Sequence, residues 1–401
     1  MDNLLRKLAS PFSHSETSYL SLMSWLTKWS LRSFAIPLTS ESGGKEGTRF
    51  LIIDKIRHWV IYVCTALIWF FYNVMYSFWF YKNIYNSNGS ISLPVWQKVI
   101  AFYFLISYDM IFGLHVCLLF RKRELLQVLK TCVWIEKKCV GRGASDYAKI
   151  NILSNLDACK FSLFAIPVML GALGIFRPCM PPSIANAVLL QCRDGWSDQD
   201  AALWFRLING FMQGYVWFSV PAVMVVTISR LMLYPSVMVE LWIKMIEGQL
   251  AHYKYAIHGL SAFRVAQVFQ NLVNSVMGKP LITIFVSLSI MCQIISLYVI
   301  ITSWEKISFG VSAFFYLMGI DFFVVIHITL HSLSKSYVVT VKFAKNMTSL
   351  RSQNAWFKKF LRSCPPLKVG MGDGKFFDGL TSFIIWQFCV DRLINMLLLD
   401  K

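Results

Sequence analysis

Long apolar stretches alternate with polar segments along the whole chain. Seven of them are candidate membrane spans, and each except the third exceeds the roughly 18–20 residues that cross about 30 Å of hydrocarbon. The third is shorter, because its uninterrupted apolar run covers only residues 161–176. We expect the spans at residues 59–81, 94–120, 156–176, 203–233, 281–302, 307–331 and 376–399.

The polar segments between the spans also carry helical patterns. Apolar residues recur with helical spacing in residues 237–246, 262–277 and 337–361, which predicts cytosolic helices that continue spans four, five and six. Residues 364–374, with two prolines and three glycines, break the chain before the last span. The sequence therefore predicts an all-α, polytopic membrane protein with a cytosolic helical anchor. Its expected segments are 1–57 (cytosolic N-terminus), 58–230 (spans one to four), 231–280 (anchor helices), 281–333 (spans five and six), 334–375 (anchor helix and break) and 376–401 (span seven).

Composition and charge give an orientation. The chain is 56% hydrophobic and only 15% charged, and its mean hydropathy of +0.54 is that of a membrane protein. The N-terminal segment and every second gap between spans hold 31 of the 39 Lys and Arg residues, counting residues near span ends with the adjoining gap. Positive residues stay cytosolic during insertion, so we expect a cytosolic N-terminus and an extracellular C-terminus. The basic face fits anionic membrane lipids rather than nucleic acid.

The N-terminal segment has no long apolar region before Arg57, so no cleaved signal peptide is expected. Residues 19–34 have the pattern of an amphipathic helix with Lys28 and Arg32 on it. Such a helix lies on the inner membrane interface or packs on the bundle.

Two features of the outer loops follow from this topology. Asn88 begins an Asn-Gly-Ser sequon in an expected outer loop, whereas the sequon at Asn346 falls in an inner one, so glycosylation is predicted at Asn88. Cys179 and Cys192 share one outer loop, where the oxidising exterior permits a disulfide. The alternative is two unpaired thiols.

Catalytic motifs are absent from the sequence: no G-x-S-x-G, no Walker A loop, no G-x-G-x-x-G after a strand and no C-x-x-C occurs. His327 and His331 have the i, i+4 spacing that can chelate a metal, but no second pair accompanies them. We therefore expect neither an enzyme nor a cofactor or metal.

Charged and polar residues within the spans carry more information, because each is costly in hydrocarbon unless partnered or wet. Asp109 and Asp321 make polar contacts inside the bundle or contact ligand or water. In span seven a polar stripe recurs at four-residue steps, and two aliphatic residues lie on the same side. This face is either a pore wall with an aliphatic constriction or a set of interhelical hydrogen bonds. The stripe is Gln387, Asp391 and Asn395, and the aliphatic pair is Ile394 and Leu398.

The outer halves of spans two to six are rich in aromatic and small residues with few polar groups. Glycines beside rings suit a dry pocket for a small volatile or lipid-like ligand, although each residue alone also fits ordinary helix packing. The candidate ligand-binding residues are Phe102, Tyr103, Ile106, Gly171, Ile175, Ile208, Met212, Tyr215, Val216, Phe315 and Tyr316.

With these features the chain resembles the insect odorant receptors over its whole length. The resemblance is most specific in the last third: Ser336-Tyr337, the run WFKKFLRSCPP at 356–366, then LKVG at 367–370, and Phe376-Phe377 leading into FIIWQFCVDRLINMLLL. Thr381-Ser382 and Gln387-Phe388 are similar to the signature of the gustatory receptors, but Ser stands where Tyr is expected and one residue is missing between the two pairs. That family is the alternative.

The resemblance implies a ligand-gated, non-selective cation channel in the plasma membrane of a sensory dendrite. It further implies a heterotetramer with the odorant receptor co-receptor, an odorant pocket among spans two to six, and a pore lined by the last helix. The family's hydrophobic gate would lie in the final two turns, among Ile394, Leu397 and Leu398. The chain lacks the co-receptor's long insertion between spans four and five, which implies a ligand-tuning subunit. A metabotropic seven-helix receptor would need the opposite orientation.

Overall fold

The computed structural model describes residues 19–42, 48–53, 55–82, 94–139, 146–181, 183, 202–251, 256–350, 359–360, 362–372 and 374–399, and these are mostly helical. The helices are α2 (Tyr19–Arg32), α3 (Ile56–Phe80), α4 (Val95–Phe120), α5 (Lys122–Cys139), α6 (Asp146–Phe176), α8 (Leu203–Val226), α9 (Tyr234–Ala251), α10 (Ala256–Met277), α11 (Leu281–Thr302), α12 (Phe309–Val324), α13 (Leu330–Leu350) and α15 (Thr381–Leu399). Two π-helical segments, η5 (Thr227–Leu233) and η7 (Val325–Thr329), join α8 to α9 and α12 to α13. The strands form two hairpins, β1 (Leu38–Ser42) with β2 (Thr48–Ile52) and β3 (Gly370–Gly372) with β4 (Lys375–Phe376).

The described residues contain seven helices that are long and apolar enough to cross a membrane, which confirms the predicted number of spans. Their limits agree with the predicted ones within a few residues, except that the helices of spans four and six continue well beyond the predicted ends and the last helix begins later than predicted. The last helix begins at Thr381, because Phe376 belongs to a strand and Asp378, three residues before Thr381, caps the helix start. The Thr381 hydroxyl donates to Asp378 Oδ1 at 2.7 Å, and the Asp378 amide donates to Thr381 Oγ1 at 2.9 Å. This reciprocal pair satisfies polar groups at the helix start.

Two of the seven helices are much longer than a bilayer is thick. The helix that contains α8, η5 and α9 is continuous over 48 residues, and the one that contains α12, η7 and α13 over 40 residues. At 1.5 Å per residue they measure about 72 Å and about 60 Å, against about 30 Å of hydrocarbon. The predicted continuation of spans four and six is thus confirmed. Span five differs, because residues 278–280 separate α10 from α11.

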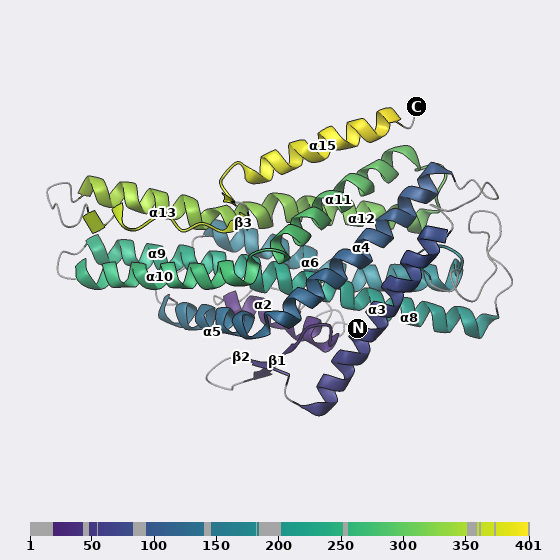
Figure 1. Cartoon of the computed structure of the whole chain (residues 1–401), viewed down its shortest axis with the longest axis horizontal. Helices are drawn as coiled ribbons and strands as arrows, with labels where there is room; N and C mark the ends of the chain where they lie inside the picture. Colours follow the sequence, from purple (N-terminus) through teal and green to yellow (C-terminus); the bar gives the residue numbers. More distant parts are fainter. Residues whose placement is uncertain are drawn as a thin grey trace, which may run out of the picture.

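The extended ends of these helices pack together into a second helical layer with α5 and α10 (Figure 1). Phe263 of α10 stacks on Phe343 of α13 with ring centroids 5.5 Å apart. Trp242 of α9 is buried and donates from Nε1 to the Ala262 carbonyl at 2.9 Å. An apolar core therefore continues beyond the seven-helix bundle, and it explains why large aromatic residues occur in segments that the sequence places outside the membrane.

Helix α2 packs on α6 and α8. Met23 and Leu26 are fully buried, and Trp29 contacts Phe164 of α6 edge to face, with centroids 5.5 Å apart. Arg230 of η5, itself buried, donates from Nε to Thr27 Oγ1 at 2.7 Å. Of the two placements that the sequence allowed, the structure therefore shows packing on the bundle.

Helix α15 lies along one edge of the molecule (Figure 1). It follows the β3–β4 hairpin, whose turn contains Gly372 and Gly374 with φ of 99° and 75°, values that favour glycine. Its main contacts are with α11, η7 and α13. One long face of this helix therefore has no neighbour among the described residues.

Candidate functional site

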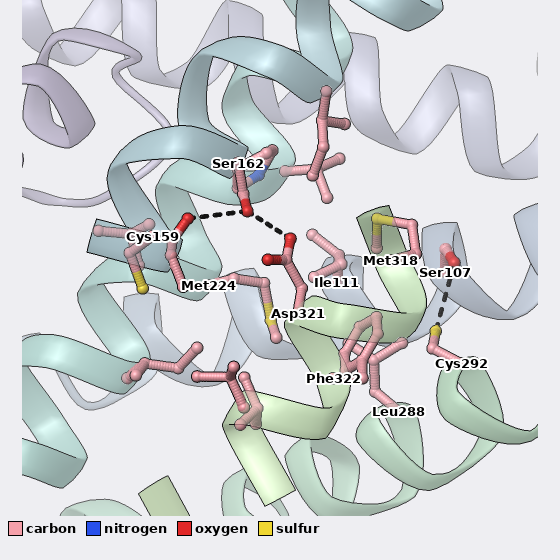
Figure 2. A pocket seen from close by; sticks show the side chains of 18 of the residues that line it. Ser107, Ile111, Cys159, Ser162, Met224, Leu288, Cys292, Met318, Asp321 and Phe322 are labelled. Carbon is pink, nitrogen blue, oxygen red and sulfur yellow. Dashed lines mark hydrogen bonds between the residues drawn. The ribbon is translucent and has the colours of Figure 1, made fainter. Parts of the chain in front are cut away.

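A cavity lies in the middle of the bundle, between α4, α6, α8, α11 and α12 (Figure 2). Its volume is about 80 Å³, measured as space open to the centre of a water molecule. Most of its wall is aliphatic, aromatic or thioether surface, from Ile111, Ala158, Ile166, Trp217, Val220, Pro221, Met224, Val225, Ile228, Leu288, Met318, Phe322, Val324 and Val325. A small set of polar residues completes it: Tyr103, Ser107, Asn155, Cys159, Ser162, Cys292 and Asp321. A concave, mostly apolar wall with few polar groups is the usual chemistry of a small-molecule site.

The polar groups of the cavity are only partly paired. Ser162 Oγ lies within hydrogen-bond distance of Asp321 Oδ2 and of the Ala158 carbonyl, the latter at 2.9 Å (Figure 2). Ser107 donates to the Tyr103 carbonyl at 2.8 Å. The Tyr103 hydroxyl is buried and makes no hydrogen bond of normal geometry to any described residue. Asp321 is the only Asp, Glu, Lys, Arg or His side chain in the lining that the structure describes.

A cluster of aromatic rings adjoins the cavity, which it reaches at Tyr103 and Trp217. Tyr103 lies edge to face against Phe315 with centroids 5.1 Å apart, and Phe104 stacks on Phe314 at 5.8 Å. Trp217 meets Phe104 at 5.6 Å and donates from Nε1 to the Tyr108 hydroxyl at 3.0 Å. Rings in such arrangements interact favourably beyond the area that they bury, so these contacts stabilise the packing beside the cavity.

The residues predicted to bind ligand lie mostly outside the cavity. Of the eleven, Tyr103 lines it, and Phe315 and Val216 are buried beside residues that do. Phe102, Ile208 and Tyr316 are exposed on the single chain, while Ile106, Met212 and Tyr215 are half-buried. The Tyr215 hydroxyl is hydrogen-bonded to Thr65 Oγ1 at 2.7 Å. On α6, α8 and α12 the cavity lies nearer to the second helical layer than the predicted residues do.

The remaining two predicted residues, Gly171 and Ile175, belong to the contact between α6 and α8. A Cβ atom on Gly210 would lie 2.8 Å from the Gly171 carbonyl oxygen and would also clash with Ile175. A Cβ on Gly174 would lie 3.1 Å from the Gly210 Cα. The glycines therefore let two backbones approach closely, as small residues do between membrane helices.

Sequence reasoning identified Asp321 as an intramembrane charge and left two roles open for it, a polar contact inside the bundle or a contact with ligand or water. The other lining residues that it missed, such as Ser162, Met224 and Met318, are ordinary positions on apolar helices. The cost of an acid in hydrocarbon was the one signal that pointed to this cavity.

The polar stripe of span seven lies on the exposed face of α15. Gln387, Asp391 and Asn395 are all exposed on the single chain. Ile394 and Leu398 are also exposed, with exposed fractions of 49% and 63%, whereas Leu397 is partly buried against the core. The stripe therefore makes no hydrogen bonds to neighbouring helices within the described part of one chain.

An aromatic contact connects the cavity to α15. Asp321 and Phe322 line the cavity. The adjacent Phe323 meets Trp386 of α15 edge to face at 5.2 Å, and His327 lies 5.5 Å from the same ring. Instead of joining a metal cluster, none of which occurs among the described residues, His327 packs against Phe323 and Trp386.

The predicted outer-loop features fall at the limits of the described chain. Cys179 is buried and disulfide-bonded, but Cys192 lies outside the described residues, so their pairing remains a prediction. Asn88 also lies outside them. The competing sequon residue Asn346 donates from its amide to Glu247 Oε1 at 2.8 Å, in the contact between α13 and α9.

Comparison with solved structures shows the same fold elsewhere. The structure of the insect olfactory receptor OR5 from Machilis hrabei aligns with a TM-score of 0.63 and 12% identity, over 94% of this chain and 99% of that chain. The same receptor in complex with eugenol aligns with a TM-score of 0.64 and 12% identity, over 95% and 99%. No protein-family model and no curated protein matches the chain. The likeness shows the fold of a multi-pass membrane protein over nearly the whole length.

Proposed function

We propose that this chain is the ligand-tuning subunit of an odorant-gated cation channel. The observation that carries the proposal is the match to the olfactory receptor fold over 94% of this chain and 99% of the other. A mostly apolar cavity in the bundle supports it, because a volatile ligand is small and apolar. That a neighbour of the same fold is known in complex with eugenol adds to this support.

The exposed face of α15 supports a pore that is formed between subunits. Exposed polar residues on a helix of this length would be costly against lipid, so the stripe of Gln387, Asp391 and Asn395 faces water or another subunit. The Asp391 carboxylate would attract cations, and Ile394 and Leu398 on the same face would form a constriction that closes by dewetting. In this proposal Leu397 is not part of the gate, because it packs against the core and not on the face of the polar stripe.

The contact at Trp386 supplies a physical route from ligand to pore. A ligand between α4, α6, α8 and α12 contacts the wall that contains Phe322, and the next residue, Phe323, packs on Trp386 of α15. The π-helical segment η7 lies at this junction, and such segments often occur at functional sites. Ligand opens the pore only if it binds the open arrangement more tightly than the closed one.

The partner in this proposal is the odorant receptor co-receptor, in a heterotetramer in the plasma membrane of sensory dendrites. The unpartnered face of α15 fits an arrangement in which several such helices surround a common axis. Because this face of α15 has no neighbour within the described part of the chain, a pore lined by it must be enclosed by other subunits.

Whole-cell recording tests the proposal. Cells that express the chain with and without the co-receptor are exposed to a broad panel of volatiles that includes eugenol. We expect a fast, reversible, non-selective cation current only in co-expressing cells. The gustatory alternative would be favoured if no volatile evoked a current in cells with confirmed surface expression while non-volatile tastants did. A slow response that G-protein inhibitors block would contradict the channel.

A further inference from the structure

The cavity contains an acid without a counter-charge. Asp321 lines the cavity with part of its surface exposed, and no Lys, Arg or His side chain accompanies it in the described lining. A carboxylate in apolar surroundings is costly unless an opposite charge or several hydrogen bonds compensate it. An ionised Asp321 therefore depends on Ser162 and on a positive charge from what occupies the cavity, whereas in an empty cavity protonation would neutralise the acid.

Ser162 compensates the carboxyl group incompletely. Its hydroxyl has one proton, yet it lies within hydrogen-bond distance of two acceptors, Asp321 Oδ2 and the Ala158 carbonyl. When the Ser162 hydroxyl donates its proton to the Ala158 carbonyl, the Asp321 carboxyl group has no hydrogen-bond donor among the described residues. Figure 2 shows Ser162 beside Asp321 at the cavity wall.

Tyr103 presents a second unsatisfied polar group to the same cavity. Its side chain is 1% exposed, and its hydroxyl lies near Ser107 and Cys292 without a hydrogen bond of normal geometry to any described residue. A buried hydroxyl without a partner is unfavourable, and each such group needs an explanation. A polar atom of a bound molecule would supply the missing partner.

We propose that Asp321 selects a small volatile amine, bound as its ammonium ion with an apolar body. This inference rests on the proposed function and names the ligand class of the same site. An ammonium group has up to three N–H donors and no acceptor. It therefore supplies both the positive charge that Asp321 lacks and donors for the carboxylate and the Tyr103 oxygen. An alcohol supplies one donor and no charge.

The rest of the wall fits the apolar body of such an amine. Phe322, Leu288 and Met318 line the cavity together with Asp321 and present ring, aliphatic and thioether surface. Thioether side chains adapt to irregular shapes. The site therefore combines one fixed charge with a tolerant apolar surface, so head-group charge dominates its selectivity over body shape.

Equilibrium binding to the complex of the full chain and co-receptor, purified in lipid nanodiscs, tests the proposal independently of current. The probes are two sets matched in shape: benzylamine, benzyl alcohol and ethylbenzene; and pentylamine, pentanol and hexane. We expect each amine to bind at least about tenfold more tightly than its alcohol, as charge-assisted hydrogen bonds are the stronger ones. Asp321→Asn should remove that preference and change alcohol affinity less than about threefold.

Two further variants keep the test decisive. Asp321→Glu retains the charge and should retain the amine preference, which separates loss of charge from loss of folding. Asp109→Asn neutralises an acid that is exposed on α4 and does not line the cavity, so it should leave all affinities unchanged. Equal affinity of amines and alcohols in the unmodified protein would overturn the proposal, as would a preference that survives Asp321→Asn. Amine binding that depends on Asp321 but opens no current would refute the channel and not the amine site.

Discussion

The carbonyl oxygen of Gly171 on α6 lies so near Gly210 on α8 that a Cβ atom there would approach it to 2.8 Å. Backbone cannot move aside as a flexible side chain can, so Gly210→Ala should push the two helices apart. We expect this substitution to lower the free energy of unfolding by about 1–3 kcal/mol, the usual cost of overpacking. A lowered midpoint of thermal unfolding of the purified protein would measure it.

Gly214 provides the matched control for this contact. It also faces α6, but a Cβ there would meet the Pro167 carbonyl at 3.6 Å, an ordinary van der Waals distance. Gly214→Ala should leave the midpoint unchanged or raise it slightly, because alanine loses less conformational freedom than glycine on folding. Equal destabilisation by both substitutions would contradict the close contact at Gly210.

The wall of the cavity predicts which aromatic residue controls ligand size. Tyr103 lines the cavity with its ring against Phe315, whereas the adjacent Phe102 is 41% exposed on the other side of α4. Tyr103→Ala should enlarge the cavity and shift the most potent ligands toward bulkier molecules. Concentration–response curves for a homologous series of ligands, at matched surface expression, would measure the shift.

Phe102→Ala and Met212→Ala serve as controls for that series, because neither residue lines the cavity. Both were predicted from the sequence to bind ligand, so they separate the sequence-based pocket from the cavity of the structure. Potency that changes at Phe102 or Met212 and not at Tyr103 would favour the sequence-based pocket.

The sequence predicted the spans well and the cavity poorly, for physical reasons. Hydrocarbon demands about 20 apolar residues per crossing, so a span such as Leu281–Thr302 is visible in composition alone. Within a bundle, residues that line a void and residues that fill one are equally apolar, so Met318 and Phe314 cannot be told apart. Helix α2 posed the same problem, because an amphipathic stripe suits a lipid interface and a protein groove alike.

The junction between α12 and α15 predicts a residue that transmits opening. Trp386 contacts Phe323 and His327 and does not line the cavity. Trp386→Ala should therefore leave ligand binding within about threefold and shift the opening equilibrium by about 0.5–2 kcal/mol, the range found for residues that carry coupling. Maximal current at saturating ligand, compared with equilibrium binding, would separate the two effects.

Trp304→Ala is the control for this substitution, because Trp304 is exposed and contacts Tyr316 rather than α15. It should alter neither maximal current nor binding. If Trp386→Ala weakened binding and current in proportion, the contact would support the cavity instead of transmitting opening.

The exposed face of α15 predicts which leucine closes the pore. Leu398 is 63% exposed on the face of the polar stripe, while its neighbour Leu397 packs against the core. A polar side chain in a hydrophobic constriction favours water there and lowers the barrier to ions. Leu398→Ser should therefore raise the current that flows without ligand. Leu397→Ser should instead reduce the amount of folded protein at the cell surface, because it removes buried apolar area. Whole-cell current normalised to surface expression distinguishes the two, and ligand-independent current from Leu397→Ser alone would move the gate to the other face of the helix.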